Sequence, residues 1–197
     1  MNKKLYTQET LNSLAKICHQ RAVDKGFWDD LYSVMHYLML VISELSEAVE
    51  ADRKGKWAML DHDTIDTLQR IEGESFVKMF LDEVKDTVED ELADAVIRLL
   101  DLLGHLLSVM RPPSVFIEGI SGEYDDREAP KMLTEALMPI VAEASGLFSL
   151  SNYMVGIFYA INSLEQLCDH LGIDLMSHIE LKMKYNETRP ALHGKKY

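Results

Sequence analysis

The spacing of hydrophobic residues along the chain predicts a protein made of α-helices. Apolar side chains recur every three or four residues over most of the sequence, the interval that places them on one helix face. The pattern predicts helices over residues 7–24, 30–53, 75–109, 130–147, 151–171 and 174–185, and one short helix ending at Gly73. Residues 111–130, rich in Pro, Gly, Asp and Glu, are the best candidate for a loop.

The composition supports this prediction and narrows the class of protein. Only 5 Pro and 10 Gly among 197 residues leave little room for a β architecture with many turns, and the length suits one domain with a sizeable core. The N-terminal residues lack the apolar run of a signal peptide, and every apolar stretch is interrupted by charge. We therefore expect a single all-α domain over residues 1–197, cytoplasmic and without a membrane span.

Charge and cysteine content exclude two further classes. The net charge of −13 argues against a general nucleic-acid binder, which needs a basic surface. It does not exclude a phosphate ligand, because a bound divalent cation reverses the local electrostatics. Cys18 and Cys168 are the only cysteines, and their spacing indicates neither a disulfide framework nor a zinc site.

Two pairs of carboxylates lie inside apolar runs of predicted helices. Glu44 and Glu47 are three residues apart, as are Glu91 and Asp94, so each pair shares a helix face. Asp101 falls on nearly the same side as Asp94, two turns later. Carboxylates in apolar runs are costly unless something pairs with them. Spacing alone leaves open ordinary surface or salt-bridged acids, because other pairs in the chain have the same spacing.

If the two helices pack together, the four carboxylates converge. Ligands that are all oxygen favour a hard cation, which here means Mg²⁺, with Mn²⁺ as a possible substitute. A di-iron bundle would need glutamate followed by histidine three residues later, and no glutamate in this chain has that neighbour. The pattern therefore predicts a magnesium site rather than a di-iron site.

The C-terminal residues are basic in an otherwise acidic chain. Lysine and arginine side chains of this kind complement phosphate oxygens, whereas Asn and Tyr can hydrogen-bond or stack on a base. The alternative is a solvated C-terminus whose positive charge suits a helix end. The candidate substrate-binding residues here are Lys182, Tyr185, Asn186, Arg189, His193 and Lys195.

Five blocks of sequence resemble the all-α nucleoside triphosphate pyrophosphohydrolases, specifically the MazG-like branch related to dCTP pyrophosphatases and dimeric dUTPases. They occur in the family's order and cover about half the chain. The last, K-x-x-Y-N-x-T-R-P-x-x-H-G-K-K, is the most specific. The blocks are Lys25–Asp29, Ser43–Ala48, Glu91–Arg98, Leu171–Asp174 and Lys182–Lys196.

The resemblance implies a Mg²⁺-dependent enzyme that cleaves a nucleoside triphosphate between the α and β phosphates, giving the monophosphate and pyrophosphate. It implies a helical bundle that assembles as a homodimer or homotetramer, without nucleic acid or membrane partners. The implied metal ligands are Glu44, Glu47, Glu91 and Asp94. Glu47 is our candidate for the residue that deprotonates the attacking water. Trp28 is the candidate for stacking on the base, in preference to Phe27, and Asp101 for a position near the metal or substrate.

The chain departs from the family in two places. Residues 48–90, between the two carboxylate pairs, form a longer spacer than is usual in the family, and residues 106–168 are a probable helical insertion. These additions leave substrate choice and quaternary structure open. Two alternatives remain at this point. One is a metal-dependent hydrolase of another pyrophosphate, such as phosphoribosyl-ATP, and the other is a helical module that binds nucleotides without turnover.

Overall fold

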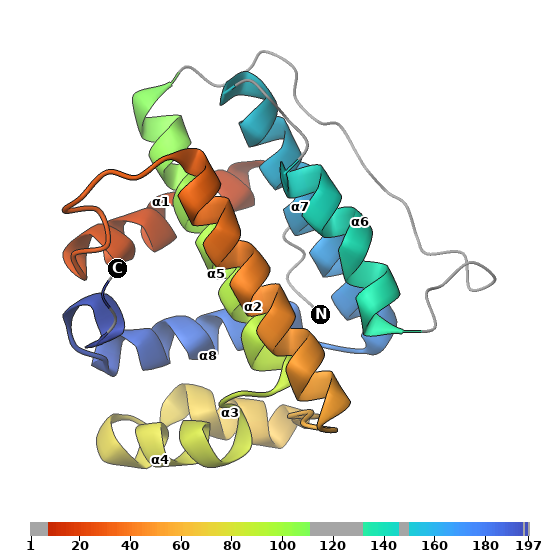
Figure 1. The fold of residues 1–197 in the computed structure, drawn as a ribbon. Coiled ribbons are helices and arrows are strands. Elements are labelled where there is room, and N and C mark those ends of the chain that lie inside the picture. The colour runs from red at the N-terminus through yellow and green to blue at the C-terminus, as the bar shows by residue number, and fades with distance from the viewer. Residues whose placement is uncertain (1–7, 111–131, 146–149, 195, 197) are drawn as a thin grey trace.

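The structure is a computed structural model that describes residues 8–110, 132–145, 150–194 and 196. Eight α-helices and no strand occur in these residues, so the predicted all-α class is confirmed (Figure 1). None of these helices combines the length and apolar character needed to cross a membrane. The elements are α1 (Gln8–Asp24), α2 (Val34–Arg53), α3 (His62–Arg70), α4 (Gly73–Glu83), α5 (Val88–Val109), α6 (Leu133–Ser145), α7 (Leu150–Leu171), α8 (Leu175–Thr188) and a 3₁₀ turn (Ala191–Gly194).

Helix α5 is the centre of the fold. It packs against α1, α2, α7 and α8 (Figure 1). Most of its side chains are buried. Leu92, Val96, Leu99 and Leu103 are fully enclosed in the main core. Helices α6 and α7, from the predicted insertion, pack against each other and extend this core over α2 and α5. A helix surrounded on all sides is a rigid support, so side chains at its few polar positions are held in place.

Helices α3 and α4 form a separate small unit with its own core. Its buried residues are Leu68, Phe76, Phe80 and Val84, joined by Leu181 of α8. Lys184 links this unit to α8. Its Nζ donates to the backbone oxygens of Leu68, Gln69 and Ile71 at 3.0, 3.0 and 2.6 Å. These carbonyls end α3 and have no partner within that helix. Helix α8 is thus supported on one side by α5 and on another by α3 and α4.

The prediction of one long helix over residues 75–109 is wrong. The chain breaks between α4 and α5, where Asp86 has a left-handed backbone with φ of 61°. Thr87 is the N-cap of α5, and its Oγ1 accepts a hydrogen bond from Asp90 N at 3.3 Å. Asp90 Oδ2 in turn accepts from Asp86 N at 3.1 Å. Thr-x-x-Asp is the signature of a capped helix start, and hydrophobic periodicity continues across it without a sign of the break.

Other predicted boundaries agree more closely. Asp174 caps α8 as predicted, accepting from Ser177 N at 3.2 Å, although the helix continues to Thr188. Helix α2 begins at Val34 rather than Asp30, after the N-cap residue Ser33, whose backbone is extended. The predicted loop at 111–130 and the junction near Ser149 lie outside the described residues.

Helices α1 and α5 cross at very short range. A Cβ added to Gly104 would lie 2.3 Å from the backbone oxygen of Ala15 and 2.6 Å from Cβ of His19. Glycine in a helix interior costs about 1 kcal/mol relative to alanine. Here it permits contact of the two helix backbones, and this contact places His19 beside Asp101 of α5.

Candidate functional site

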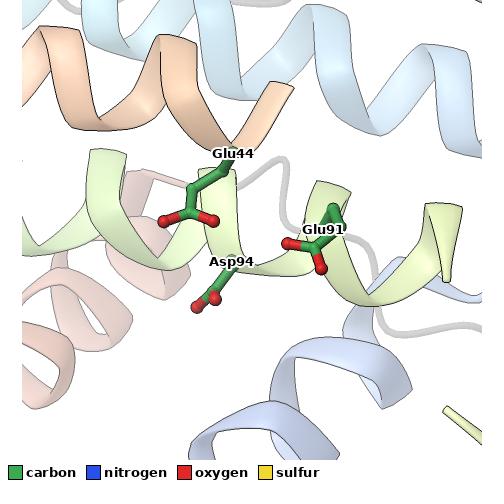
Figure 2. Close-up of side chains that lie close together, drawn as sticks. All are labelled: Glu44, Glu91 and Asp94. Carbon is green, nitrogen blue, oxygen red and sulfur yellow. The ribbon is translucent and has the colours of Figure 1, made fainter. Parts of the chain in front are cut away.

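Three of the four predicted metal ligands converge between α2 and α5. Carboxylate oxygens of Glu44, Glu91 and Asp94 all lie within 4.8 Å of one another (Figure 2). Glu44 reaches down from α2, while Glu91 and Asp94 stand on successive turns of α5. Glu44 and Glu91 are each only 3% exposed. The packing of α2 on α5 therefore brings together carboxylates that are 47 to 50 residues apart in sequence.

The fourth predicted ligand lies outside this group. Glu47 is exposed on α2, one turn beyond Glu44. Its charge still acts on the group, since it contributes to the raised pKa of Glu44. The roles of Glu47 as a metal ligand and as a base remain predictions.

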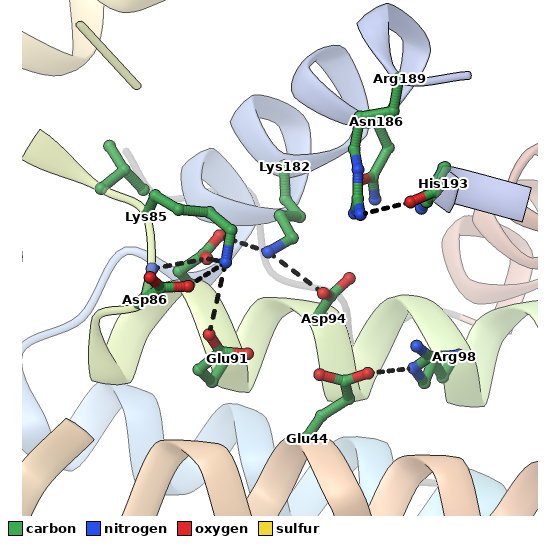
Figure 3. A network of polar contacts seen from close by, with 12 residues as sticks. Glu44, Lys85, Asp86, Glu91, Asp94, Arg98, Lys182, Asn186, Arg189 and His193 are labelled. Atoms are coloured by element: carbon green, nitrogen blue, oxygen red, sulfur yellow. Dashed lines mark hydrogen bonds and ion pairs between the residues drawn. The ribbon is translucent and has the colours of Figure 1, made fainter. Parts of the chain in front are cut away.

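Two cations of the chain pair with two of the three carboxylates, Asp94 and Glu44. Lys182 Nζ, from α8, donates to Asp90 Oδ1 at 2.7 Å and lies 3.1 Å from Asp94 Oδ2. Arg98 Nε, one turn beyond Asp94 on α5, donates to Glu44 Oε1 at 2.5 Å (Figure 3). The sequence predicts phosphate binding for Lys182, whereas in the fold its side chain is 1% exposed and held between two carboxylates.

A second acidic group adjoins the first. Oxygens of Asp86, Asp90 and Glu91 also lie within 4.8 Å of one another, and Lys85 forms ion pairs with all three (Figure 3). Because Glu91 belongs to both groups, the two form one continuous strip of carboxylates along the start of α5.

Burial raises the pKa of these carboxylates, and the neighbouring lysine and arginine side chains lower it. Burial, partly opposed by Lys182, raises the pKa of Glu91 to about 8. Burial and the nearby Asp94 raise the pKa of Glu44, against the effect of Arg98. For Asp94 burial acts in the same direction, but Lys182 and Arg98 outweigh it and lower the pKa. Burial therefore disfavours the charged forms of Glu44 and Glu91 even beside Arg98 and Lys85, and a bound divalent cation would offset that cost.

A pocket of about 400 Å³ opens beside the carboxylates. It lies between α1, α2, α5, α8 and the C-terminal turn, and its lining residues are of two kinds. The apolar and aromatic ones are Cys18, Ala22, Phe27, Tyr32, Tyr37, Leu40, Ile97 and Met183. The charged and polar ones are Arg21, Asp24, Lys25, His36, Asp94, Arg98, Asp101, Asn186, Glu187, Arg189 and His193.

Four predicted substrate-binding residues line this pocket. They are Asp101, Asn186, Arg189 and His193. Arg189 Nη2 donates to the backbone oxygen of His193 at 3.2 Å, and Nη1 lies 3.4 Å from Asn186 Oδ1. Burial and the charge of Arg189 lower the pKa of His193 to about 4, so its imidazole is neutral near pH 7.

Two predicted aromatic contacts are occupied by the protein's own rings. Trp28 is stacked between Tyr37 and His105, with ring centroids 4.4 and 4.2 Å away, and its Nε1 donates to Asp101 at 2.9 Å. Tyr185 is stacked on Phe80 of the α3–α4 unit at 4.5 Å. Neither ring is part of the pocket wall, so base stacking by either remains a prediction. Lys195 lies outside the described residues.

Sequence reasoning missed several residues that shape the pocket. Phe27 lines the wall and meets the ring of His193 edge-on at 5.0 Å. Lys25 joins the α1–α2 turn to the C-terminal turn, donating to Arg189 O at 2.5 Å while its own backbone oxygen accepts from Leu192 N at 2.8 Å. Arg98 pairs with Glu44. Phe27 and Arg98 lie inside the sequence blocks that resemble the family. An arginine four residues after Asp94 lies on the same helix face as that carboxylate, and this spacing could have indicated that Arg98 is near the acidic group.

Comparison with known proteins leaves the site to be interpreted from its geometry and sequence blocks. A search with protein-family models, one of curated proteins and one of solved structures gave no significant match to the chain.

Proposed function

We propose that the chain is a Mg²⁺-dependent hydrolase that cleaves a nucleoside triphosphate between the α and β phosphates, releasing the monophosphate and pyrophosphate. One observation carries the proposal: a group of three carboxylates adjoins, through Asp94, a pocket lined by apolar and aromatic side chains together with arginines. A nucleotide has complementary groups, an apolar base and an anionic phosphate chain that arginines and a carboxylate-bound cation would neutralise. Family resemblance in the sequence blocks supports the same reaction.

The donor set fits the metal. Glu44, Glu91 and Asp94 offer only carboxylate oxygens, which Mg²⁺ prefers over nitrogen or sulfur. Burial raises the pKa of Glu44 and of Glu91, and a divalent cation would offset the cost of keeping these buried carboxylates charged. These three residues would hold Mg²⁺, with Glu47 as the fourth predicted ligand. When bound, the ion supplies charge neutralisation on the phosphates and on the departing pyrophosphate.

The chain's own residues would position the substrate. Arg98 and Arg189 present guanidinium groups to the pocket and suit the phosphate oxygens. Phe27 and Ile97 exclude water from the part that would receive the base. Lys182 holds Asp94 ionised and fixed in place. Positioning and charge compensation of this kind account for most of the catalysis of phosphoryl transfer.

A product analysis tests the proposal. The protein is incubated with each ribo- and deoxyribonucleoside triphosphate and Mg²⁺, and the products are separated by anion-exchange chromatography. Monophosphate with pyrophosphate is the expected result, whereas diphosphate with orthophosphate contradicts it. Including phosphoribosyl-ATP distinguishes hydrolysis of another pyrophosphate, and calorimetric binding without turnover would identify a binding module.

A pair of matched variants ties the activity to the site. Glu44→Gln removes one carboxylate of the buried group, and we expect at least a hundredfold loss of turnover. Glu50→Gln makes the same change on the same helix at an exposed residue paired with Arg53 and Lys54, and we expect wild-type turnover. Equal activity of the two variants would show that the carboxylate group is not the reaction centre.

A further inference from the structure

Arg98 stands between the carboxylate group and the pocket. Its Nε donates to Glu44 Oε1, and its Nη groups, four N–H donors in all, have no hydrogen-bond partner among the described residues. The side chain is 23% exposed and lines the pocket. Arg98 therefore has one partner on the carboxylate side and free donors for a ligand on the pocket side.

Lys182 has the opposite surroundings. It is 1% exposed, contacts Asp90 and Asp94 together, and is not part of the pocket wall. Moving Lys182 would leave Asp90, which is fully buried, without its closest cation, and this is strongly unfavourable. Arg98 differs from Lys182 because its side chain lines the pocket, and a divalent cation held by the carboxylate group would replace its charge beside Glu44, whose side chain is 4% exposed.

Glu44 pairs with Arg98 through Oε1 and belongs to the carboxylate group that would hold a divalent cation. Such a cation near Glu44 and Asp94 would repel the guanidinium and weaken its pair with Glu44. The planar guanidinium matches the oxygens of phosphate, often through two parallel hydrogen bonds. An anion in the pocket therefore offers Arg98 a second partner on the side where its donors are free.

We propose that Arg98 exchanges partners, leaving Glu44 for a phosphate group of the pocket ligand, so that the divalent cation and the anion each strengthen the binding of the other. The proposal rests on the proposed function for the nature of both ligands. By linkage, the factor by which the cation improves anion binding equals the factor by which the anion improves cation binding. The site would then remain poorly occupied until both ligands are present.

Calorimetric titration of the whole chain tests this exchange with two probes. The first is Mg²⁺ alone, and the second is inorganic tripolyphosphate with Mg²⁺ in excess. In Arg98→Gln, we expect Mg²⁺ alone to bind about tenfold more tightly, because Glu44 has lost its competing cation, and tripolyphosphate to bind about tenfold more weakly. Arg53→Gln is the control, since it removes the same charge from an exposed pair, and both affinities should match the wild type.

The opposite shifts separate exchange from a fixed structural role. If Arg98 only orients Glu44, both probes bind Arg98→Gln more weakly, and the proposal is overturned. Arg98→Lys keeps the charge without the planar fork, so we expect near wild-type Mg²⁺ affinity and severalfold weaker tripolyphosphate binding. Should Arg98→Gln fail to fold by circular dichroism, this variant decides alone, and unchanged tripolyphosphate affinity overturns the proposal. A wild type that binds no Mg²⁺ at millimolar concentrations overturns the proposed function as well.

Discussion

Two cation–carboxylate pairs lie one after the other along α5, and their surroundings differ. Near the start of the helix, Lys182 and Asp90 are enclosed where α8 packs on α5, with exposures of 1% and 0%. Farther along, Arg98 lines the pocket and its side chain is 23% exposed, whereas that of its partner Glu44 is 4% exposed. The pairs have similar chemistry and similar distances. Access of the cation to the pocket, and not the strength of the pairing, distinguishes a structural pair from one that a ligand can reach.

Of the changes that test this difference between the pairs, Lys182→Met is expected to have the largest effect on stability. Removing the buried ammonium leaves Asp90 and Asp94 without their shared cation, and we expect the free energy of unfolding to fall by about 3–5 kcal/mol. Urea denaturation followed by circular dichroism measures it. Arg98→Gln should lose less, about 1–2 kcal/mol, because the Arg98 side chain is 23% exposed and glutamine can still donate a hydrogen bond to Glu44, whose side chain is 4% exposed. Similar losses in the two variants would remove the distinction between the pairs.

A stabilising change is expected at Glu91. Its folded pKa of about 8 lies above the ordinary value near 4.5, so the folded protein binds the extra proton and Glu91 costs stability as pH rises from about 4.5 through 8. With chelator present at pH 8, Glu91→Gln should be more stable than the wild type by on the order of 2 kcal/mol. The difference should shrink toward pH 5. Thermal unfolding across this range measures it, and a pH-independent difference would show that the buried charge of Glu91 is not its cause.

The smallest effect on stability is expected at Lys184, which lies outside the site. Lys184→Met removes the ammonium that holds three carbonyls at the end of α3, and we expect a loss of about 1 kcal/mol. Hydrogen exchange should show faster opening of α3 and α4, with amides of α5 unchanged. Faster exchange throughout α5 would mean that the α3–α4 unit belongs to the same cooperative unit as the main bundle.

The sequence was most informative where local pattern and packing agree. Helical periodicity predicts the class, and the apolar setting of Glu44 and Asp94 singles out carboxylates that the structure brings together. The same periodicity carried the prediction across Asp86 and Thr87, because a helix start marked by a capping residue leaves the spacing of apolar residues intact. Capping residues and hydrophobic periodicity therefore have to be considered separately when helix boundaries are predicted.

Side-chain partners could not be predicted, because they depend on how helices distant in sequence meet. Lys182 looks from sequence like one of several basic residues in the tail, and only the packing of α8 on α5 buries it against Asp90. Trp28 stands in a recognised block, but its two neighbouring rings, Tyr37 and His105, come from α2 and α5. The chemistry of a residue is readable from sequence, whereas its orientation requires the assembled fold.

The close crossing of α1 and α5 has a consequence for how this sequence can vary. A side chain at position 104 would have to displace the backbone of Ala15, and with it the His19 ring that pairs with Asp101. Substitution at 104 should therefore be among the least tolerated in the chain, although Gly104 touches no ligand. Homologues that keep this crossing should show glycine three residues after the aspartate at 101, a spacing that a search for distant relatives can add to the carboxylate pairs.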